Sequence, residues 1–171
     1  MWRSFMRMAW LFALYGGIAR AGGPDPVSDL ALPEIVAVTA NAVFGQIVQA
    51  GNGNTANLQQ NGDTNNAAII QPGDRNSAAA QQQGSQQYAF LQQTGNDNQA
   101  FLQQTGTLNS ASVLQSGNDN TSHVTQNGAQ NRALVEQIGD FNTAIVTQYA
   151  NGANAVVRQY GDHATSTVIQ Y

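Results

Sequence analysis

The sequence predicts an all-β fold, a two-faced β-solenoid of about six 22-residue rungs, each made of strand, turn, strand and turn. Three observations predict it. A glutamine recurs every eleven residues, a glycine follows two residues later in every complete unit except at Ala150, and the residues between them alternate in type. A fixed period over most of a chain indicates stacked structural units. The recurring glutamines are Gln49, Gln60, Gln71, Gln82, Gln93, Gln104, Gln115, Gln126, Gln137, Gln148, Gln159 and Gln170.

Residues 1–21 have the features of a secretory signal peptide. Arg3 and Arg7 precede an apolar run over 8–18, and small residues follow at Ala19 and Ala21. A membrane anchor is the alternative, but about eleven apolar residues are too few to span a bilayer. We therefore expect cleavage after Ala21 and a secreted protein.

Residues 22–42 lie outside the repeat and contain three prolines, so we interpret them as an N-terminal leader or linker, either disordered or a partial cap. The chain after residue 21 has three arginines, no lysine and ten carboxylates, which gives three minus ten, or −7. This charge excludes a basic nucleic-acid-binding surface. There is no cysteine, so an exported chain must be stabilised by repetition rather than by disulfides.

Residues 43–171 read as units of one strand and one short turn. Ala or Ser follows each glutamine by seven residues and an apolar residue follows it by nine, so these side chains share one face of a strand. A helix is excluded because its apolar stripe would contain Gly, Asn and Gln. Val43, Gly45 and Ile47 extend the frame backwards to twelve strands.

Asparagine follows most of the glutamines by five residues, on the same inward face. Stacked rungs about 4.8 Å apart would place these amides above one another as ladders, with apolar columns between them. We therefore predict Asn and Gln ladders as the assembly residues. The ladder asparagines are Asn54, Asn65, Asn76, Asn98, Asn109, Asn120, Asn131 and Asn142.

Burial of the inward apolar side chains falls far short of the entropy lost by ordering so many residues. Neighbouring copies are therefore expected to contribute. The strand over 166–170 carries no charge, and Tyr171 follows it directly. Proteins that stay monomeric protect such edges with charge or proline. We interpret this strand as an elongation face, and a frayed terminus is the alternative.

Aspartates recur in the turns about once per rung, which predicts a charged column along one edge of the solenoid. Like charges about 5 Å apart repel, so assembly is expected to speed up below about pH 4 or with salt or divalent cations. The alternative is that aspartate is simply a good turn residue, and one carboxylate per turn is too few for a calcium site. The residues are Asp74, Asp97, Asp119, Asp140 and Asp162.

Outward aromatic residues occupy equivalent positions in the frame, as in the pair Phe90 and Phe101. Tyr149 and Tyr171 stand two units apart, so they are expected to stack in adjacent rungs. His123 and His163 have no nucleophile or carboxylate constellation beside them. We predict no catalytic, cofactor-binding or metal-binding residues and no enzymatic activity.

These columns resemble the curlin repeat, in which Gln, Gly, Asn and Ala stand at fixed offsets before the next Gln. The resemblance covers about 43–171. Curlins are the subunits of curli, the bacterial surface amyloid fibres of the biofilm matrix. The resemblance implies export through an outer-membrane secretion pore with accessory assembly factors. It also implies extracellular polymerisation with copies of the chain itself and with other curlin subunits, in adhesion and biofilm formation.

Within that family the major subunit favours a Gly-x-Gly-Asn turn, which occurs here only at 51–54. Turns such as Gly-Asp-Arg-Asn at 73–76 and Gly-Asp-Phe-Asn at 139–142 are more similar to the minor subunit, as is the irregular unit at 148–152. The ending Ile-Gln-Tyr at 169–171 resembles the major subunit instead. The resemblance favours the minor subunit, which nucleates polymerisation and anchors fibres to the cell. The major subunit, forming the bulk of the fibre, is the alternative.

Two further classes of protein fit the pattern less well. A monomeric β-solenoid adhesin or ice-binding module would need a regular outer array of one residue type, whereas the outer column here mixes residues such as Asn57, His123 and Ile145. An enzyme on a β-helix would need a convergent acidic or nucleophilic cluster, which the sequence lacks. The fibre subunit remains the leading hypothesis.

Overall fold

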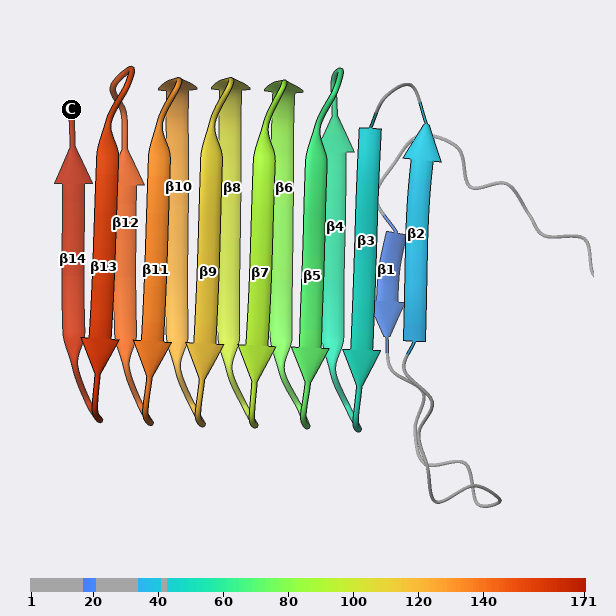
Figure 1. Ribbon diagram of the computed structural model, residues 1–171, viewed down its shortest axis with the longest axis vertical. Coiled ribbons are helices and arrows are strands. Elements are labelled where there is room, and N and C mark those ends of the chain that lie inside the picture. The colour runs from blue at the N-terminus through green and yellow to red at the C-terminus, as the bar shows by residue number, and fades with distance from the viewer. Residues whose placement is uncertain (1–16, 21–33, 41–42) are drawn as a thin grey trace, which may run out of the picture.

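Fourteen strands form two sheets in the computed structural model, which describes residues 17–20, 34–40 and 43–171, and from β3 to β14 they alternate between the sheets (Figure 1). Sheet A contains, in spatial order, β1 (Gly17–Arg20), β4 (Thr55–Asn61), β6 (Ser77–Ser85), β8 (Gln99–Thr107), β10 (Thr121–Ala129), β12 (Thr143–Gln148) and β14 (Thr165–Gln170). Sheet B contains β13 (Asn154–Tyr160), β11 (Arg132–Ile138), β9 (Ser110–Ser116), β7 (Tyr88–Thr94), β5 (Asn66–Pro72), β3 (Val43–Ala50) and β2 (Glu34–Ala40).

The strands from β3 to β14 pair in parallel, and each residue lies beside its equivalent two units along the chain. In sheet A, Gln126 lies beside both Gln104 and Gln148, and in sheet B, Gln137 lies beside Gln115 and Gln159. Consecutive strands fall in opposite sheets, so two eleven-residue units make one rung. The predicted β-solenoid of about six rungs is confirmed.

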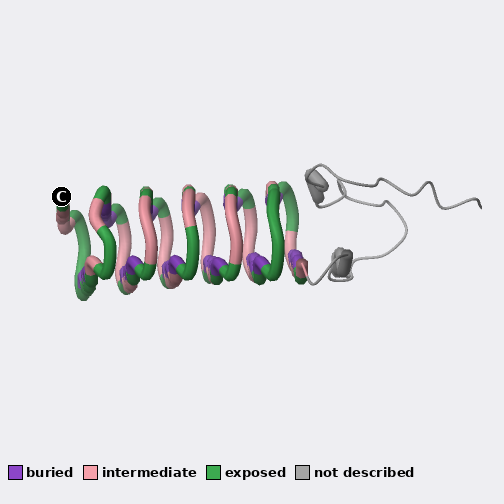
Figure 2. Tube along the Cα trace, turned by 90° about the horizontal axis from the view of Figure 1, so that it is seen from above, coloured by how far each residue is buried: buried purple, intermediate pink, exposed green. Residues whose placement is uncertain are grey.

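The core lies between the two sheets and is filled by every second residue of each strand. In most strands alanine and one larger apolar residue point inward, whereas β6 contributes two alanines, Ala78 and Ala80. Buried and less buried residues alternate along the chain (Figure 2). The larger of these residues, among them Ile69, Leu91 and Val135, are fully buried. Beside most of these larger side chains the strand also contributes an inward alanine, whose small side chain fills the remaining space. Glutamine and asparagine complete the same inward face.

Each turn passes very close to the turn of the next rung. Gly95 has a φ of 106°, and a Cβ added there would lie 2.1 Å from the carbonyl oxygen of Gly117. No side chain can occupy this place, which explains the glycine column. Two residues later the backbone again has a positive φ, but here nine of the turns carry a residue with a side chain. These are Thr64, Arg75, Gln86, Asp97, Leu108, Asp119, Gln130, Phe141 and His163.

Two antiparallel strands lie at the N-terminal end of the solenoid. β1 pairs with β4, and β2 pairs with β3 along its length. The predicted signal peptide, 1–21, lies outside the described residues except for β1, and the leader, 22–42, contributes β2. At the other end β13 and β14 each have one neighbouring strand in their sheets. The described residues contain no helix that is long and apolar enough to cross a membrane.

Candidate functional site

Two glutamine ladders run the length of the solenoid, one in each sheet. In every rung the Nε2 group of a glutamine donates to the Oε1 atom of the glutamine 22 residues later, at 2.6–2.9 Å. The structure thus brings all twelve glutamines of the repeat into two columns. Gln49 and Gln159 are the ends of the ladder in sheet B, and Gln60 and Gln170 are the ends in sheet A.

Eleven of the twelve ladder glutamines also tie the two sheets together. The Nε2 group of Gln71, for example, donates a second bond of 3.1 Å to the carbonyl oxygen of Thr55, at the start of the facing strand. The same bond is made by eleven of the glutamines, at 2.9–3.3 Å. Most of these side chains are fully buried, so both amide protons must be satisfied within the protein. Gln60 and Gln170, in the terminal rungs, are partly exposed.

The predicted asparagines form two further columns, at the junctions of strand and turn. Asn98 is typical: its Nδ2 group donates to the carbonyl oxygen of Gly117 at 2.8 Å, and its Oδ1 atom accepts the backbone N–H of Asn120 at 3.1 Å. The side chain therefore satisfies the carbonyl group of the glycine turn in the next rung. An aspartate could not do this, because it has no amide donor. All eight asparagines are buried.

One position breaks an asparagine column. Gln87 stands between Asn65 and Asn109, and its Nε2 group donates to the carbonyl oxygens of Gln83 and Gly106 as an asparagine would. Its Oε1 atom, however, is buried without a hydrogen-bond partner. The extra methylene group places this oxygen out of line with the backbone N–H of Asn109. The sequence shows the departure from the pattern but not the unpaired acceptor.

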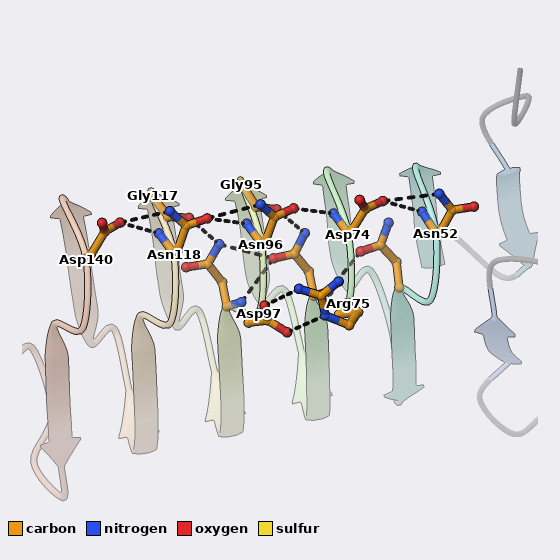
Figure 3. A network of polar contacts seen from close by, with 12 residues as sticks. Asn52, Asp74, Arg75, Gly95, Asn96, Asp97, Gly117, Asn118 and Asp140 are labelled. Atoms are coloured by element: carbon orange, nitrogen blue, oxygen red, sulfur yellow. Dashed lines mark hydrogen bonds and ion pairs between the residues drawn. The ribbon is translucent and has the colours of Figure 1, made fainter.

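The turn aspartates lie on one edge of the solenoid, as expected, but they do not form one charged column. Asp74 and Asp140 share a column with Asn52, Asn96 and Asn118, whereas Asp97 lies in the next column with Arg75 (Figure 3). Asp162 continues the first of these columns and Asp119 the second. The expectation of a single column is wrong because the residue two units after Asp74 is Asn96, and Asp97 stands one position further along the turn.

The Asn and Asp side chains of this column stabilise the turns by hydrogen bonding to the backbone of the adjacent rung, in addition to any charge repulsion between the aspartates. The carboxylate of Asp74 accepts the backbone N–H of Asn52 at 2.7 Å, and the carboxylate of Asp162 accepts that of Asp140 at 2.8 Å. Neutral Asn96 and Asn118 separate Asp74 from Asp140. Consecutive rungs carry like charges only at Asp140 and Asp162 in this column.

Arg75 and Asp97 form a two-point ion pair across adjacent rungs. The Nε and Nη2 atoms of Arg75 donate to the two carboxylate oxygens of Asp97, at 2.8 and 2.6 Å (Figure 3). This hydrogen bonding lowers the pKa of Asp97 below its ordinary value and raises the pKa of Arg75. Sequence analysis missed the pair, although the two opposite charges stand at equivalent positions two units apart.

A second ion pair joins β11 and β13 on the outer face of sheet B. The Nε atom of Arg158 donates to Glu136 at 3.2 Å, and the hydroxyl group of Tyr160 donates to the same carboxylate at 3.1 Å. The pKa of Tyr160 is raised, first by desolvation and then by this hydrogen bond. Glu136 and Arg158 again occupy equivalent positions two units apart. Their 22-residue spacing in the sequence could therefore have predicted this ion pair.

Aromatic side chains stack between adjacent rungs. Tyr149 and Tyr171 stack as predicted, with ring centroids 5.8 Å apart. Phe90 and Phe101 lie in opposite sheets, on β7 and β8, so they do not share a face. Phe101 stacks instead on His123, at 4.8 Å. His163 likewise stacks on Phe141, at 5.0 Å. Both imidazole groups therefore serve as packing partners, and within the described residues no group of three or more His, Asp or Glu side chains could hold a metal ion.

Comparison with known proteins identifies the repeat. A model of the curlin associated repeat matches residues 51–78, 73–106, 95–128 and 123–149, which together span 51–149, more than half of the chain. The chain belongs to the curlin repeat family. No curated protein and no solved structure matches it. Curlin repeats indicate a subunit of extracellular curli fibres that assembles with other curlin subunits, and together with the β-solenoid fold they point to a non-enzymatic protein.

The terminal rungs of these curlin repeats differ in what they leave unpaired. At the N-terminal end, the Oε1 atom of Gln49 is buried without a partner. At the C-terminal end, Gln159 donates to Thr143 and to the hydroxyl group of Ser166, but no glutamine follows it in the ladder. One end of this ladder therefore has an unused acceptor, and the other end carries the amide group that would donate to it.

Proposed function

We propose that this chain is the minor, nucleating curlin subunit, which templates polymerisation of the major subunit and anchors curli fibres at the bacterial cell surface in adhesion and biofilm formation. In this proposal the signal peptide at 1–21 directs export, and an outer-membrane pore with accessory factors secretes the chain. One observation carries the templating role. The strands repeat in register every two units, and the last strands, β13 and β14, each have one neighbour.

Such an edge can template a second chain that has the same period. An incoming strand would gain the backbone hydrogen bonds of a parallel ladder and, in each sheet, one glutamine–glutamine bond. Only a chain with glutamine in the same register makes both sets of bonds. The edge therefore selects for curlin repeats, since a mismatched strand would leave the terminal amides unpaired.

The turns support the minor rather than the major role. The Gly-x-Gly-Asn turn, which the major subunit favours, occurs only at 51–54. In nine other turns the position of the second glycine carries a side chain in the left-handed backbone region, among them Leu108 and Phe141. Such residues cost about 1–2 kcal/mol each relative to glycine. A subunit needed in small amounts tolerates this cost better than the bulk of a fibre.

The test is seeding at low ratio. The mature chain, 22–171, is added in trace amounts to a curlin major subunit, and the lag before fibre formation is measured. We expect a shorter lag well below equimolar ratios. A variant with Gln170→Ala should seed less well because it interrupts the ladder at the edge, while Thr167→Ala, which changes an exposed side chain on the same strand, should seed normally. A lag that changes only near equimolar ratios would favour the major subunit.

Sedimentation separates the fibre subunit from the monomeric β-solenoid. Purified mature chain is incubated for a day and centrifuged. Fibres should sediment and give the strand and sheet spacings of about 4.8 and 10 Å in diffraction. A chain that remains monomeric throughout would rule out the fibre subunit.

A further inference from the structure

We propose that β2 is a releasable cap on the first rung, and that a second copy of the chain replaces it by placing its last rung, β13 and β14, against β3 and β4. This proposal rests on the polymerising function proposed above. It adds which rungs of two copies meet and states that β2 controls whether they can meet. The cap would hold the N-terminal edge closed in the monomer, so that joining two copies requires β2 to leave.

β2 closes an edge that the repeat would otherwise leave open. It pairs with β3 from Glu34, opposite Gln49, to Ala40, opposite Val43. The strands from β3 to β14 pair with one another in parallel, and each pair joins equivalent positions of successive rungs. β2, by contrast, pairs antiparallel with β3. A strand in this direction cannot continue the repeat columns. β2 therefore ends the stack instead of extending it.

The cap covers the edge without satisfying it. Gln49 is 1% exposed, yet its Oε1 atom has no hydrogen-bond partner. At each later position of this ladder, the corresponding oxygen accepts a bond from the glutamine of the preceding rung. The buried acceptor of Gln49 thus marks the place where a donor from a preceding rung belongs. β2 is a weaker occupant of this edge than a strand that brings such a donor.

The C-terminal rung carries the missing donor in the right register. Gln159 ends the ladder in sheet B, on β13, and its Nε2 group has a Ser166 hydroxyl at 3.2 Å where other rungs have a glutamine. The twelve strands from β3 to β14 make six whole rungs. A second copy that continues the same register therefore sets Gln49 beside Gln159 in sheet B and Gln60 beside Gln170 in sheet A.

The two sheets are capped to different degrees. β1, which covers β4, lies within the proposed signal peptide, whereas β2 lies after the expected cleavage point. Cleavage after Ala21 would remove β1 and leave β2. The first rung of the mature chain would then be open in sheet A and closed in sheet B. An incoming β14 could pair with β4 first, and release of β2 would follow. β2 competes effectively with the second copy for the edge of β3, because only two residues, 41–42, separate β2 from β3 and keep its local concentration high.

A disulfide that locks the cap tests the proposal. Ala37 and Gln46 are direct partners in the β2–β3 pair, and the chain has no cysteine of its own. In the mature chain carrying Ala37→Cys and Gln46→Cys, oxidation should lengthen the lag of self-assembly by about tenfold or more, because a covalent tether prevents release. Reduction with dithiothreitol should restore the lag of the unmodified chain. The reduced form of the same protein thus controls for folding.

A matched lock elsewhere controls for the disulfide itself. Gln46 is also the partner of Ala68, in the parallel β3–β5 pair. A chain with Gln46→Cys and Ala68→Cys joins the first two rungs and leaves β2 free, so oxidation should not lengthen its lag. Deletion of 34–40 should shorten the lag.

The outcomes separate the two proposals. If the oxidised Cys pair at 37 and 46 assembles as fast as its reduced form while the unmodified chain forms fibres, the cap is refuted and the fibre function stands. A deletion of 34–40 that leaves the lag unchanged would also refute the cap. If the unmodified chain and the reduced variants all remain monomeric in sedimentation, the fibre function fails, and the cap proposal fails with it.

Discussion

Replacing Gln87 with asparagine is expected to stabilise the solenoid, although it removes buried atoms. The change would align the side-chain oxygen with the backbone N–H of Asn109, as in the neighbouring pair Asn109 and Asn131, where this bond is 3.0 Å. An unpartnered buried acceptor costs about 1–3 kcal/mol. Loss of one buried methylene group costs about 0.8 kcal/mol. The net gain is therefore about 1 kcal/mol.

Amide hydrogen exchange measures this gain where it arises. The backbone N–H of Asn109 should exchange about fivefold more slowly in Gln87→Asn than in the unmodified chain, since about 1 kcal/mol corresponds to that factor. The denaturant midpoint should rise as well. The reciprocal change, Asn109→Gln, should lower the midpoint, because it creates the same misfit one rung later. A faster exchange at Asn109 or a lower midpoint in Gln87→Asn would refute the reasoning.

Four further changes test other parts of the structure. Thr64→Gly should raise the free energy of unfolding by about 1 kcal/mol, because Thr64 has a φ of 58° and a β-branched side chain, as denaturant unfolding would show. Ser122→Ala should raise it by about 1 kcal/mol in the same assay, since the buried hydroxyl group has no partner. Gly95→Ala should prevent the register from forming, so that circular dichroism shows loss of strand structure, because its Cβ would overlap the next turn. The Arg75 pair lowers the pKa of Asp97, so its stabilising contribution is present above the unfolded-state pKa and is lost as pH falls through the folded-state value. Arg75→Gln should therefore reduce the dependence of the denaturant midpoint on pH in the acid range, and an unchanged dependence would contradict this.

The rungs could be predicted from the sequence because one physical constraint repeats in every unit. A narrow two-sheet core admits only certain side chains, and the inward positions therefore show as columns of Gln, Ala and an apolar residue. The register follows from two units per rung, and the stacking of Tyr149 on Tyr171 follows from the register. The direction of the strands and the residues on their inward faces could therefore be predicted from the sequence alone.

The turns and the N-terminal end were less predictable. In a turn each successive residue points in a new direction, so a shift of one residue placed Asp97 in a different column from Asp74 and beside Arg75. The backbone conformation of the turns could not be predicted from residue type either, because residues as different as Thr64 and Phe141 adopt the same positive φ. β1 and β2 pair antiparallel and lie outside the repeat, so the period carries no information about them.

The direction of the glutamine ladders gives the solenoid an electrical polarity. All ten bonds run the same way, from the Nε2 group of an earlier rung to the Oε1 atom of a later one. The amide dipoles therefore add along the axis, and each bond polarises the next. A single reversed amide group would place two Oε1 acceptors against each other. Every rung that is added must therefore take the same amide orientation as the rung before it. Filaments built in this way would have chemically distinct tips and would align in an applied electric field.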